Sequence, residues 1–489
     1  AAWHIGYEGD APVWQDLAAR LARGVPDAEL RLPWRAPGML WLVLRDALPR
    51  GPAFAAATLC AVASNLVLLS SGVHAEALYL ALALVTLLDQ KALAGRSQIA
   101  VPLRWGALHG ALCLFRTEHL LTFAVLLLVA RVGRVGWRRL LLAVAGAALL
   151  IVPWQLRAAA LVREFNAAGE PATATLRWQP DAIAAVEAVP VFAQRPVVEL
   201  VEAAVRERGA TVVEHADLAV VRDAYGTWPE PLPVPWIALY GPLNFFLANS
   251  PEANGGYSRR ALDRDPPLAG GAGRYPEPVR RTLGREKRFS LGYPPHLDLT
   301  VHGYARGLAT IAADPFAALT RAARKLWYAA EGATGGIGGY ALPIGLSGVR
   351  RPVDFVTATG WWARTWRIAV LLVAGFGLWR MRANRALWPL FAFAATKLMV
   401  IAVFFGYARH GALCLPVVAV GVAAAFAPWG ARCSPRPRRR VALAALAVLL
   451  LFEVARLLHG AAATVDGRPV SAGEPFGAGD YERRRIEFR

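Results

Sequence analysis

The stretch WRRLLLAVAGAALLIVPWQLR, residues 137–157, decides the fold class of this chain. Between its flanking arginines lies an uncharged, apolar run over residues 140–156. The run reaches the roughly 17–25 residues that a membrane-spanning helix needs. Because comparable runs recur along a chain that is 56% hydrophobic, the sequence predicts an all-α polytopic membrane protein.

Apolar runs on both sides of this stretch predict about ten or eleven transmembrane helices. The candidate spans are residues 33–48, 52–72, 75–88, 105–117, 119–130, 140–156, 366–379, 386–407, 412–429 and 441–458. Several are short: a helix of about 16 residues is only about 24 Å long, so we expect tilt or local thinning of the bilayer. The polar stretch between the two groups of spans is rich in Pro and Gly, with helical patches near 196–209 and 303–331.

Basic residues concentrate in four short loops and predict the orientation of the spans. The loops contain fifteen Lys and Arg residues and no Asp or Glu, and they cover residues 91–104, 131–139, 380–385 and 432–440. The positive-inside rule places such loops in the cytoplasm, and an even number of predicted spans separates each loop from the next. The net charge of +19 therefore reflects topology, and we expect no nucleic-acid partner.

These observations divide the chain into five predicted parts. They are an external amphipathic first loop (1–32), an N-terminal transmembrane bundle (33–156), a mixed, mainly helical periplasmic or external domain (157–365), C-terminal transmembrane helices (366–458) and an external tail (459–489). In the first loop, apolar residues recur at helical spacing over 11–23, with Asp10 placed as an N-cap and Gly24 as a C-cap. A short amphipathic helix of this kind is expected to lie on the membrane surface.

Ionisable residues gather at the predicted external ends of the spans, where charge is costly and marks functional sites. The set consists of Glu8, Asp10, His74, Glu76, Arg116, Glu118, Lys325, Arg409 and His410. Acids together with cations suit a reaction in which a base activates a nucleophile and cations neutralise an anionic leaving group. Arg116 and Glu118 are two residues apart and do not face each other on one helix, so each needs a partner elsewhere or the helix breaks there.

Six stretches give the sequence a resemblance to the GT-C superfamily of membrane glycosyltransferases, in the branch of the protein O-mannosyltransferases and lipid A aminoarabinose transferases. They are GDAPVWQDLAARLARG (9–24), SSGVHAEALYLAL (70–82), GALCLFRTEHLL (110–121), VPWQLRAAA (152–160), DPFAALTRAARKLWYAAEG (314–332) and FFGYARHGALCLPVVAV (404–420). Their order and shared sidedness carry the resemblance, which covers most of the membrane part and little of residues 170–300. The chain departs from the family in that Ala11 follows Asp10 where the family often has Glu, and His410 stands where it often has Tyr. The usual first span is also absent, which leaves open a span before Ala1.

The resemblance implies an inverting glycosyltransferase that moves a sugar from a polyprenyl-phosphate donor to an acceptor at the periplasmic face of a bacterial inner membrane. In this reading Asp10 is the general base and Glu76 orients the acceptor, while the alternative for both is a helix cap. The residues implied in substrate binding are Arg116, Glu118, Asn249, Lys325, Arg409 and His410. The alternatives are snorkelling for Lys325 and a turn-forming role for Asn249. Neither the sugar nor the acceptor follows from the sequence.

Three further alternatives remain open from the sequence. His74 and Glu76 could share a divalent metal ion, although two ligands predict a weak site or none. The chain could be a transporter or flippase of a lipid-linked or anionic substrate, although no repeat is visible and the large external insert is unusual for one. A non-catalytic envelope scaffold would explain the topology but not the charges at the external face.

Overall fold

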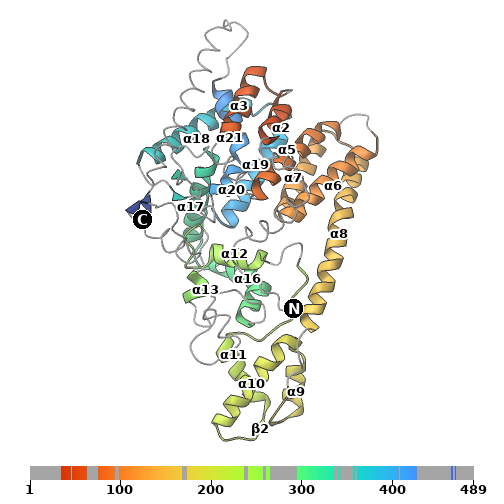
Figure 1. Cartoon of the computed structure of the whole chain (residues 1–489), viewed down its shortest axis with the longest axis vertical. Helices are drawn as coiled ribbons and strands as arrows, with labels where there is room; N and C mark the ends of the chain where they lie inside the picture. The colour runs from red at the N-terminus through yellow and green to blue at the C-terminus, as the bar shows by residue number, and fades with distance from the viewer. Residues whose placement is uncertain are drawn as a thin grey trace. The chain divides into compact units, whose positions relative to one another are not determined.

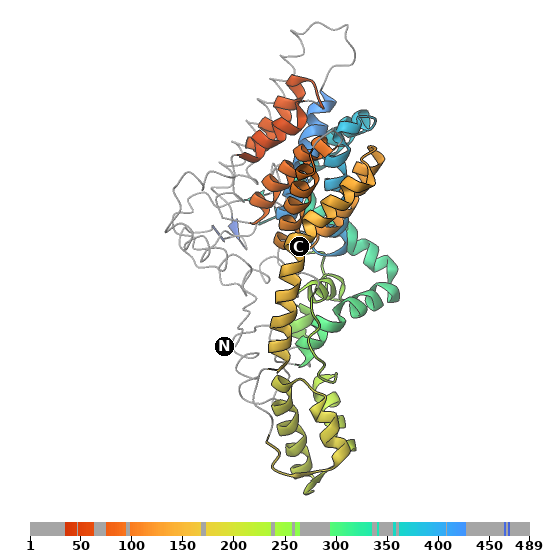
Figure 2. The same ribbon diagram turned by 90° about the vertical axis from the view of Figure 1, so that its right-hand side faces the viewer.

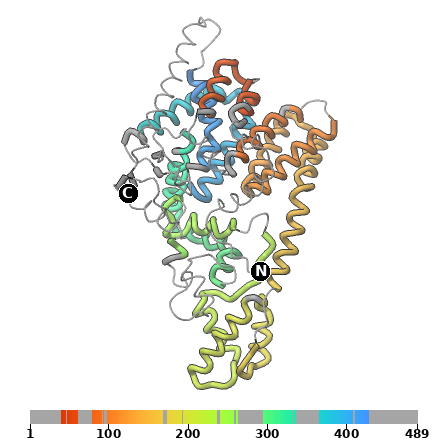
Figure 3. Tube along the Cα trace, in the orientation of Figure 1, coloured from red at the N-terminus to blue at the C-terminus, as the bar shows by residue number. Residues whose placement is uncertain are grey.

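The computed structural model describes most of the helical part of the chain (Figure 3). The described residues are 35–45, 47–62, 75–93, 98–167, 173–235, 240–256, 260–264, 294–334, 340–341, 356–357, 361–406, 408–426, 464–465 and 468–469. Within them the chain is almost entirely helical, and each strand has only two residues, so the prediction of an all-α fold is confirmed. The predicted first loop, the basic loop 432–440 and the span 441–458 lie outside the described residues.

The chain forms two compact units, and each is described by itself. The described residues of the first unit lie within Val152–Arg321, and those of the second within Asp10–Ile151 and Ala322–Arg489. Helix α8 (Trp137–Ala167) belongs to both, and it runs as one continuous helix with Pro153 inside it (Figure 2). The predicted domain boundary after residue 156 falls inside this helix.

The second unit is a bundle of helices around an apolar core (Figure 1). Besides the start of α8 and most of α17 (Pro315–Ala333), its helices are α2 (Arg35–Leu44), α3 (Arg50–Val62), α5 (Ala75–Leu93), α6 (Ala100–Phe115), α7 (His119–Val132), α18 (Trp361–Met381), η4 (Arg385–Leu387), α19 (Trp388–Val403), α20 (Ala408–Ala412) and α21 (Leu415–Ala425). Helix α18 packs on α21, α21 on α3, α5 on α6, and α7 on α19. Two antiparallel strand pairs complete the described part, β3 (Tyr340–Ala341) with β4 (Val356–Thr357) and β5 (Thr464–Val465) with β6 (Arg468–Pro469).

Glycines allow two of these helix pairs to approach closely. A methyl group on Gly106 of α6 would collide with the carbonyl oxygen of Ala143 in α8. A methyl group on Gly377 of α18 would collide with the carbonyl oxygen of Gly421 in α21. Small residues at such crossings let helix backbones touch, which is the packing that helices use within lipid.

Two helices are long and apolar enough to cross a membrane by length and composition, Trp137–Ala167 and the combined segment Arg385–Val403. Three shorter apolar helices, Leu78–Gln90, His119–Val132 and Leu415–Ala425, fall below that length. The helices α2, α3 and α6 coincide with predicted spans but are shorter than a full crossing.

The first unit contains a small helical group with an apolar core and one buried carboxylate, Glu202. The group comprises β1 (Arg177–Trp178), α9 (Pro180–Glu187), α10 (Val191–Glu207), β2 (Val212–Val213), η2 (His215–Leu218) and α11 (Ala219–Tyr225), with β1 parallel to β2. Glu202 is 3% exposed and accepts hydrogen bonds from the backbone of Thr175 (2.7 Å) and Leu176 (2.9 Å) and from the indole of Trp178 (3.1 Å). Burial raises the pKa of Glu202, but the hydrogen bond from the Thr175 hydroxyl, together with those from Leu176, Trp178 and the Thr175 N–H, outweighs it and lowers the pKa from 4.5 to about 2.

The remaining helices of the first unit are α12 (Gly241–Asn249), α13 (Arg260–Arg264) and α16 (Pro294–Ala313), and α12 packs against α16 (Figure 1). The predicted helical patch 303–331 is two helices, because α16 ends at Ala313 and α17 begins at Pro315. Proline disfavours a helical conformation in the residue before it, and the Asp314 carboxylate caps α17 by accepting a hydrogen bond from the N–H of Ala317 (2.8 Å).

Candidate functional site

The chain between α6 and α7 breaks at Arg116, and the break brings two charged side chains together. Helix α6 ends at Phe115, and Arg116 is extended, with φ −146° and ψ 110°. Helix α7 then begins at His119, directly after Glu118. Because the helix is interrupted, the Arg116 guanidinium reaches the Glu118 carboxylate and forms an ion pair with it. The sequence allowed either separate partners for Arg116 and Glu118 or a break in the helix between them. The structure has the break.

Lys397 joins this pair from α19. Its ammonium nitrogen lies 3.7 Å from Oε1 of Glu118 and 4.5 Å from the centre of the Tyr79 ring. Lys397 is 2% exposed, and within the described part of the chain its ammonium has no hydrogen-bond acceptor. A buried ammonium held only by a long ion pair and an aromatic face retains the capacity to bind a further anionic or polar group.

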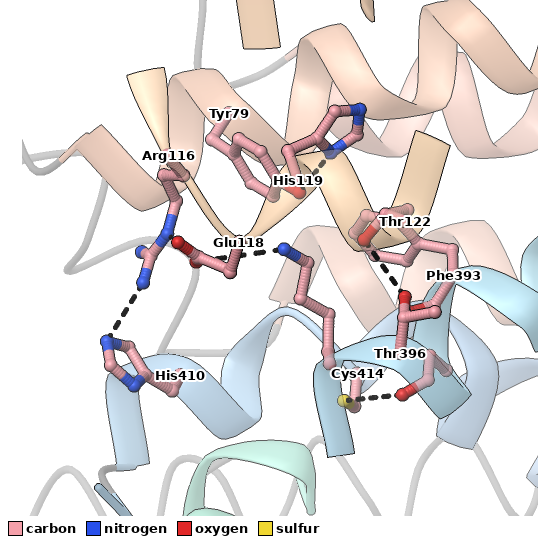
Figure 4. A network of polar contacts seen from close by, with 11 residues as sticks. Tyr79, Arg116, Glu118, His119, Thr122, Phe393, Thr396, His410 and Cys414 are labelled. Atoms are coloured by element: carbon pink, nitrogen blue, oxygen red, sulfur yellow. Dashed lines mark hydrogen bonds and ion pairs between the residues drawn. The ribbon is translucent and has the colours of Figure 1, made fainter. Parts of the chain in front are cut away.

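His410 of α20 completes what we call the ionic cluster, defined as Arg116, Glu118, Lys397 and His410. Figure 4 shows the Arg116 guanidinium between Glu118 and His410, with 3.1 Å from its Nη2 to Nε2 of His410. A guanidinium only donates hydrogen bonds, so Nε2 of His410 accepts and the ring is neutral in this arrangement. The cluster thus contains two cations against one carboxylate, which favours an anionic ligand.

A row of polar side chains continues from the ionic cluster into the bundle. The Tyr79 hydroxyl lies 2.6 Å from Nδ1 of His119 (Figure 4), and Nε2 of His119 lies 2.7 Å from Nδ1 of His109. Tyr79 and both histidines are completely buried. Beside them, the hydroxyls of Thr122 in α7 and Thr396 in α19 lie 3.0 Å apart and join these two helices.

Lys325 lies near the end of α19 and next to the turn that leads to α20. Its ammonium is 1% exposed and donates to the carbonyl of Val403, the last residue of α19 (3.1 Å). The backbone of α17 touches Gly406 and Gly411, where an added methyl group would collide with the carbonyl oxygens of Lys325 and Ala329. The structure thus brings Lys325 to the end of the bundle that carries α20.

Asn249 belongs to the first unit, and its surroundings are described within that unit. Its side chain is 4% exposed and donates to the carbonyl of Phe245, one turn earlier in α12 (2.9 Å). This bond gives Asn249 a local role at the end of its own helix, which precedes Ser250.

Four predicted residues cannot be placed by their side chains. Asp10 and His74 lie outside the described residues. Glu76 and Arg409 belong to the backbones of α5 and α20, but their side chains are not among those described. Among the described residues there is no group of three or more His, Cys, Asp and Glu side chains that could hold a metal ion. The predicted metal pair His74 and Glu76 falls outside that search.

Sequence reasoning missed Lys397 and the three buried residues Tyr79, His109 and His119. Tyr79, His109 and Lys397 lie inside predicted apolar spans, and His119 is the first residue of one. The sequence therefore held a signal for them, because polar side chains at membrane depth mark functional sites. Which helix faces meet is not visible in a single sequence, so the association of Lys397 with Glu118 required the structure.

Comparison of the chain with protein-family models, with curated proteins and with solved structures found no match.

Proposed function

We propose that this chain is a polytopic membrane glycosyltransferase that moves a sugar from a polyprenyl-phosphate donor to an acceptor at the external end of its helix bundle. The observation that carries the proposal is the ionic cluster, which is largely buried, has an excess of cations and lies at the opposite end of the helices from the described basic loops 131–139 and 380–385. The resemblance to the GT-C superfamily supplies the reaction class.

A membrane setting is supported by large apolar side chains on the outside of the bundle. Leu141 and Leu149 of α8 are 64% and 67% exposed, and Leu372 of α18 is 69% exposed. Further exposed apolar side chains lie on the same helices and on α7 and α19: Leu120, Leu128, Val132, Val144, Ile368, Phe376, Trp379, Leu398, Met399 and Val403. Apolar surface of this extent is costly in water and is expected where lipid covers it.

The sidedness of the bundle is supported by hydrogen bonds between its loops. At one end, the Arg139 side chain donates to the carbonyl of Leu93 (2.6 Å), which joins the basic loop 131–139 to the end of α5. Helix α6 starts near that end and leads over 16 residues, about 24 Å, to the ionic cluster. The cluster therefore lies at the end that the positive-inside rule assigns to the external side.

The loop 380–385 supports the same orientation through α19. Arg380 donates to the carbonyl of Ala424 at the end of α21 (2.8 Å), and Asn384 donates to the carbonyl of Ala47 (2.7 Å). Helix α19 follows this loop and contacts the start of α7 through its C-terminal half, where Thr396 meets Thr122. Both loops thus lie away from the ionic cluster.

The chemistry of the cluster suits a phosphate. A guanidinium can bind two phosphate oxygens at once, and the Lys397 ammonium adds a second positive charge next to it. When the bond between sugar and phosphate breaks, negative charge develops on the bridging oxygen, and fixed cations stabilise that state more than the bound donor. Glu118 is held between two cations, which makes it a poor proton acceptor, so its role is to position Arg116 and Lys397. The general base remains Asp10, as the resemblance implies.

The proposal is tested by transfer assays on the purified full chain. The protein in detergent is incubated with a panel of polyprenyl-phosphate sugars, and released polyprenyl phosphate is measured. We expect release from at least one donor, and a loss of roughly 10²-fold or more in Arg116→Gln. Arg195→Gln is the matched control, because Arg195 forms an exposed ion pair with Glu199 in the other unit.

Two results would count against the proposal. Absence of release from every donor would rule out the assigned reaction. Release by Arg116→Gln at the wild-type rate would rule out the assigned phosphate site. Movement of an intact lipid-linked sugar across a vesicle bilayer without release would favour the transporter instead.

A further inference from the structure

The arginines of the two described basic loops fall into two groups. Arg139 and Arg380 donate hydrogen bonds to backbone carbonyls of the bundle. Arg131 and Arg385 are exposed, and neither has a hydrogen bond or an ion pair within the described part of the chain. The guanidinium N–H groups of this second pair are therefore available to a partner outside the chain.

Tryptophan rings hold outward-facing arginines of these loops in place. The guanidinium carbon of Arg131 lies 5.2 Å from the ring centre of Trp137, and that of Arg382 lies 4.5 Å from the ring centre of Trp379. A guanidinium over an indole face has one side covered, while its N–H groups can still bind two phosphate oxygens. We call Arg131 with Trp137 the first clamp, and Arg382 with Trp379 the second clamp.

Backbone contacts fix the second clamp. The Arg382 side chain donates to the carbonyl of Trp379 (2.7 Å), and the indole of Trp388 donates to the carbonyl of Arg382 (3.2 Å). The guanidinium carbon of Arg385 lies over the ring of Trp388, 5.6 Å from its centre. The short turn between α18 and α19 thus presents two guanidinium groups, each over an aromatic ring.

An exposed apolar stripe leads along α18 to the second clamp. Four residues recur at spacings of four, four and three, which places them on one face of the helix. They are Ile368 (48% exposed), Leu372 (69%), Phe376 (48%) and Trp379 (56%). The rings of Phe376 and Trp379 are stacked, with centres 6.4 Å apart. From Ile368 to Trp379 the stripe is about 16 Å long, close to the roughly 15 Å hydrocarbon depth of one leaflet.

Helix α8 has the same order of side chains next to the first clamp. Trp137, Leu141 and Val144 follow one another at spacings of four and three residues, and they are 64%, 64% and 45% exposed. Amphipathic tryptophan rings concentrate at the headgroup level of a bilayer. Both helices therefore lead from apolar side chains through a tryptophan to an arginine, which is the order of acyl chain, glycerol and phosphate in a phospholipid.

The charges around the clamps favour an anionic headgroup over a zwitterionic one. Residues 131–139 and 379–388 contain no Asp or Glu, so neither segment stabilises the ammonium group of a zwitterionic lipid. Exposed cations next to a membrane attract a headgroup with a net negative charge. Figure 1 shows the start of α8 and α18 on opposite flanks of the bundle, so the two clamps form separate sites.

We propose that each clamp binds one anionic phospholipid of the leaflet at the basic-loop end, with the guanidinium on its phosphate and the apolar stripe along its acyl chains. A free phosphate or an acidic protein segment would leave these apolar side chains uncovered. The inference goes beyond the proposed sugar transfer and rests only on the membrane setting of that proposal.

The size of the preference follows from the charge. One arginine near an anionic lipid surface contributes about 1 kcal/mol, which corresponds to about fivefold in affinity. The cation–π contact that holds the guanidinium contributes about 0.5–1 kcal/mol at an exposed position, or about two- to fivefold. We therefore expect each clamp to bind an anionic lipid about fivefold tighter than a zwitterionic lipid with the same acyl chains.

Native mass spectrometry of the purified full chain tests this preference. The protein is titrated with dioleoylphosphatidylglycerol, dioleoylphosphatidylcholine or glycerol 3-phosphate in an uncharged detergent, and the dissociation constant of each bound molecule is measured. We expect two molecules of phosphatidylglycerol to bind about fivefold tighter than phosphatidylcholine, and the soluble headgroup not to bind. Equal affinity for the two lipids overturns the inference, and so does glycerol 3-phosphate binding as tightly as phosphatidylglycerol.

Variants separate the first clamp from the general charge of its loop. Arg131→Gln should weaken one phosphatidylglycerol molecule about fivefold, and Trp137→Leu should weaken it about two- to fivefold although no charge is removed. Arg134→Gln is the matched control, because Arg134 is exposed in the same loop and contacts no aromatic ring among the described residues. We expect this control to change the affinity by less than about twofold. A loss in Arg134→Gln as large as that in Arg131→Gln makes the attraction diffuse and overturns the inference.

The double variant Arg382→Gln/Arg385→Gln tests the second clamp and should weaken the other lipid molecule alone. Equal weakening of both molecules overturns the assignment of two separate sites. The wild-type titration decides the preference for anionic lipid even if a variant does not fold.

The two proposals fail separately. Release of polyprenyl phosphate is measured in uncharged detergent without added phospholipid, so it does not depend on the clamps. Normal release together with equal affinity for the two lipids overturns this inference alone. A preference for anionic lipid without any release leaves this inference standing and overturns the proposed reaction.

Discussion

Replacing Glu118 with Gln tests whether the ionic cluster is held together by charge. The substitution preserves size but leaves Arg116 and Lys397 next to each other with no carboxylate between them. Lys397 is 2% exposed, and the Glu118 side chain is 20% exposed, so solvent screens this repulsion only in part. Removing one partner of a buried ion pair costs about 3–5 kcal/mol, and the partial exposure of Glu118 lowers our expectation to about 2–4 kcal/mol.

Removing the second partner should reverse much of that loss. In Lys397→Met the Glu118 carboxylate still pairs with Arg116, and an apolar side chain replaces a buried ammonium, so we expect a change within about 1 kcal/mol. The double variant Glu118→Gln/Lys397→Met should therefore be more stable than Glu118→Gln alone. The coupling between the two sites is expected to be about 1–3 kcal/mol, as found for residues in one charged network.

The assay is reversible unfolding of the full chain in mixed micelles with increasing fractions of a denaturing detergent. Glu199→Gln serves as control, because this carboxylate forms an exposed pair with Arg195 and should change stability by less than about 1 kcal/mol. If Lys397→Met is as destabilising as Glu118→Gln, and the double variant equals the sum of both, the two residues are not coupled and the reasoning about the cluster is wrong.

Four further outcomes are expected. Glu202→Gln should lose about 3 kcal/mol of local stability at neutral pH, as measured by hydrogen exchange of residues 173–228. Because folding lowers the pKa of Glu202 from 4.5 to about 2, the wild-type advantage is complete above about pH 4.5 and disappears as pH falls to about 2. Gly106→Leu should prevent α6 from packing on α8 and abolish folded protein in detergent, whereas Gly136→Leu, with open space around it, should be tolerated. Arg409→Lys should retain partial sugar transfer and Arg409→Ala should lose roughly 10²-fold or more, and wild-type turnover in Arg409→Ala would make this residue a membrane-rim anchor. In intact cells, a cysteine replacing Ala210 should react with an impermeant reagent and one replacing Gly136 should not, and the reverse result would invert the proposed topology.

The helices of the bundle were largely predictable because each depends on a local run of apolar residues. The run 140–156 lies within α8, and 119–130 lies within α7. The break between α16 and α17 was also present in the sequence as Pro315, but the helical spacing on both sides concealed it. Element types follow from periodicity, whereas ends follow from single residues such as Asp314 and Pro315.

The ionic cluster was predictable only in part. The sequence indicated that Arg116, Glu118 and His410 lie toward one end of the helices, and that the helix containing Arg116 and Glu118 either breaks or finds partners elsewhere. The contact between Arg116 and His410 joins residues 294 positions apart, and it depends on how α7 packs on α19. Lys397 interrupts an apolar run without any local pattern that specifies which carboxylate it meets.

The two halves of the ionic cluster leave the ribosome at very different times. Arg116 and Glu118 are two residues apart and can neutralise each other as soon as the α6–α7 hairpin has been synthesised. Lys397 and His410 follow only after the whole of the first unit has been made. In the proposed membrane setting the hairpin can therefore insert early with its charges already paired, and the site is assembled later, when α19 and α20 dock against it. A chain truncated before α19 should insert this hairpin normally and yet contain no phosphate site.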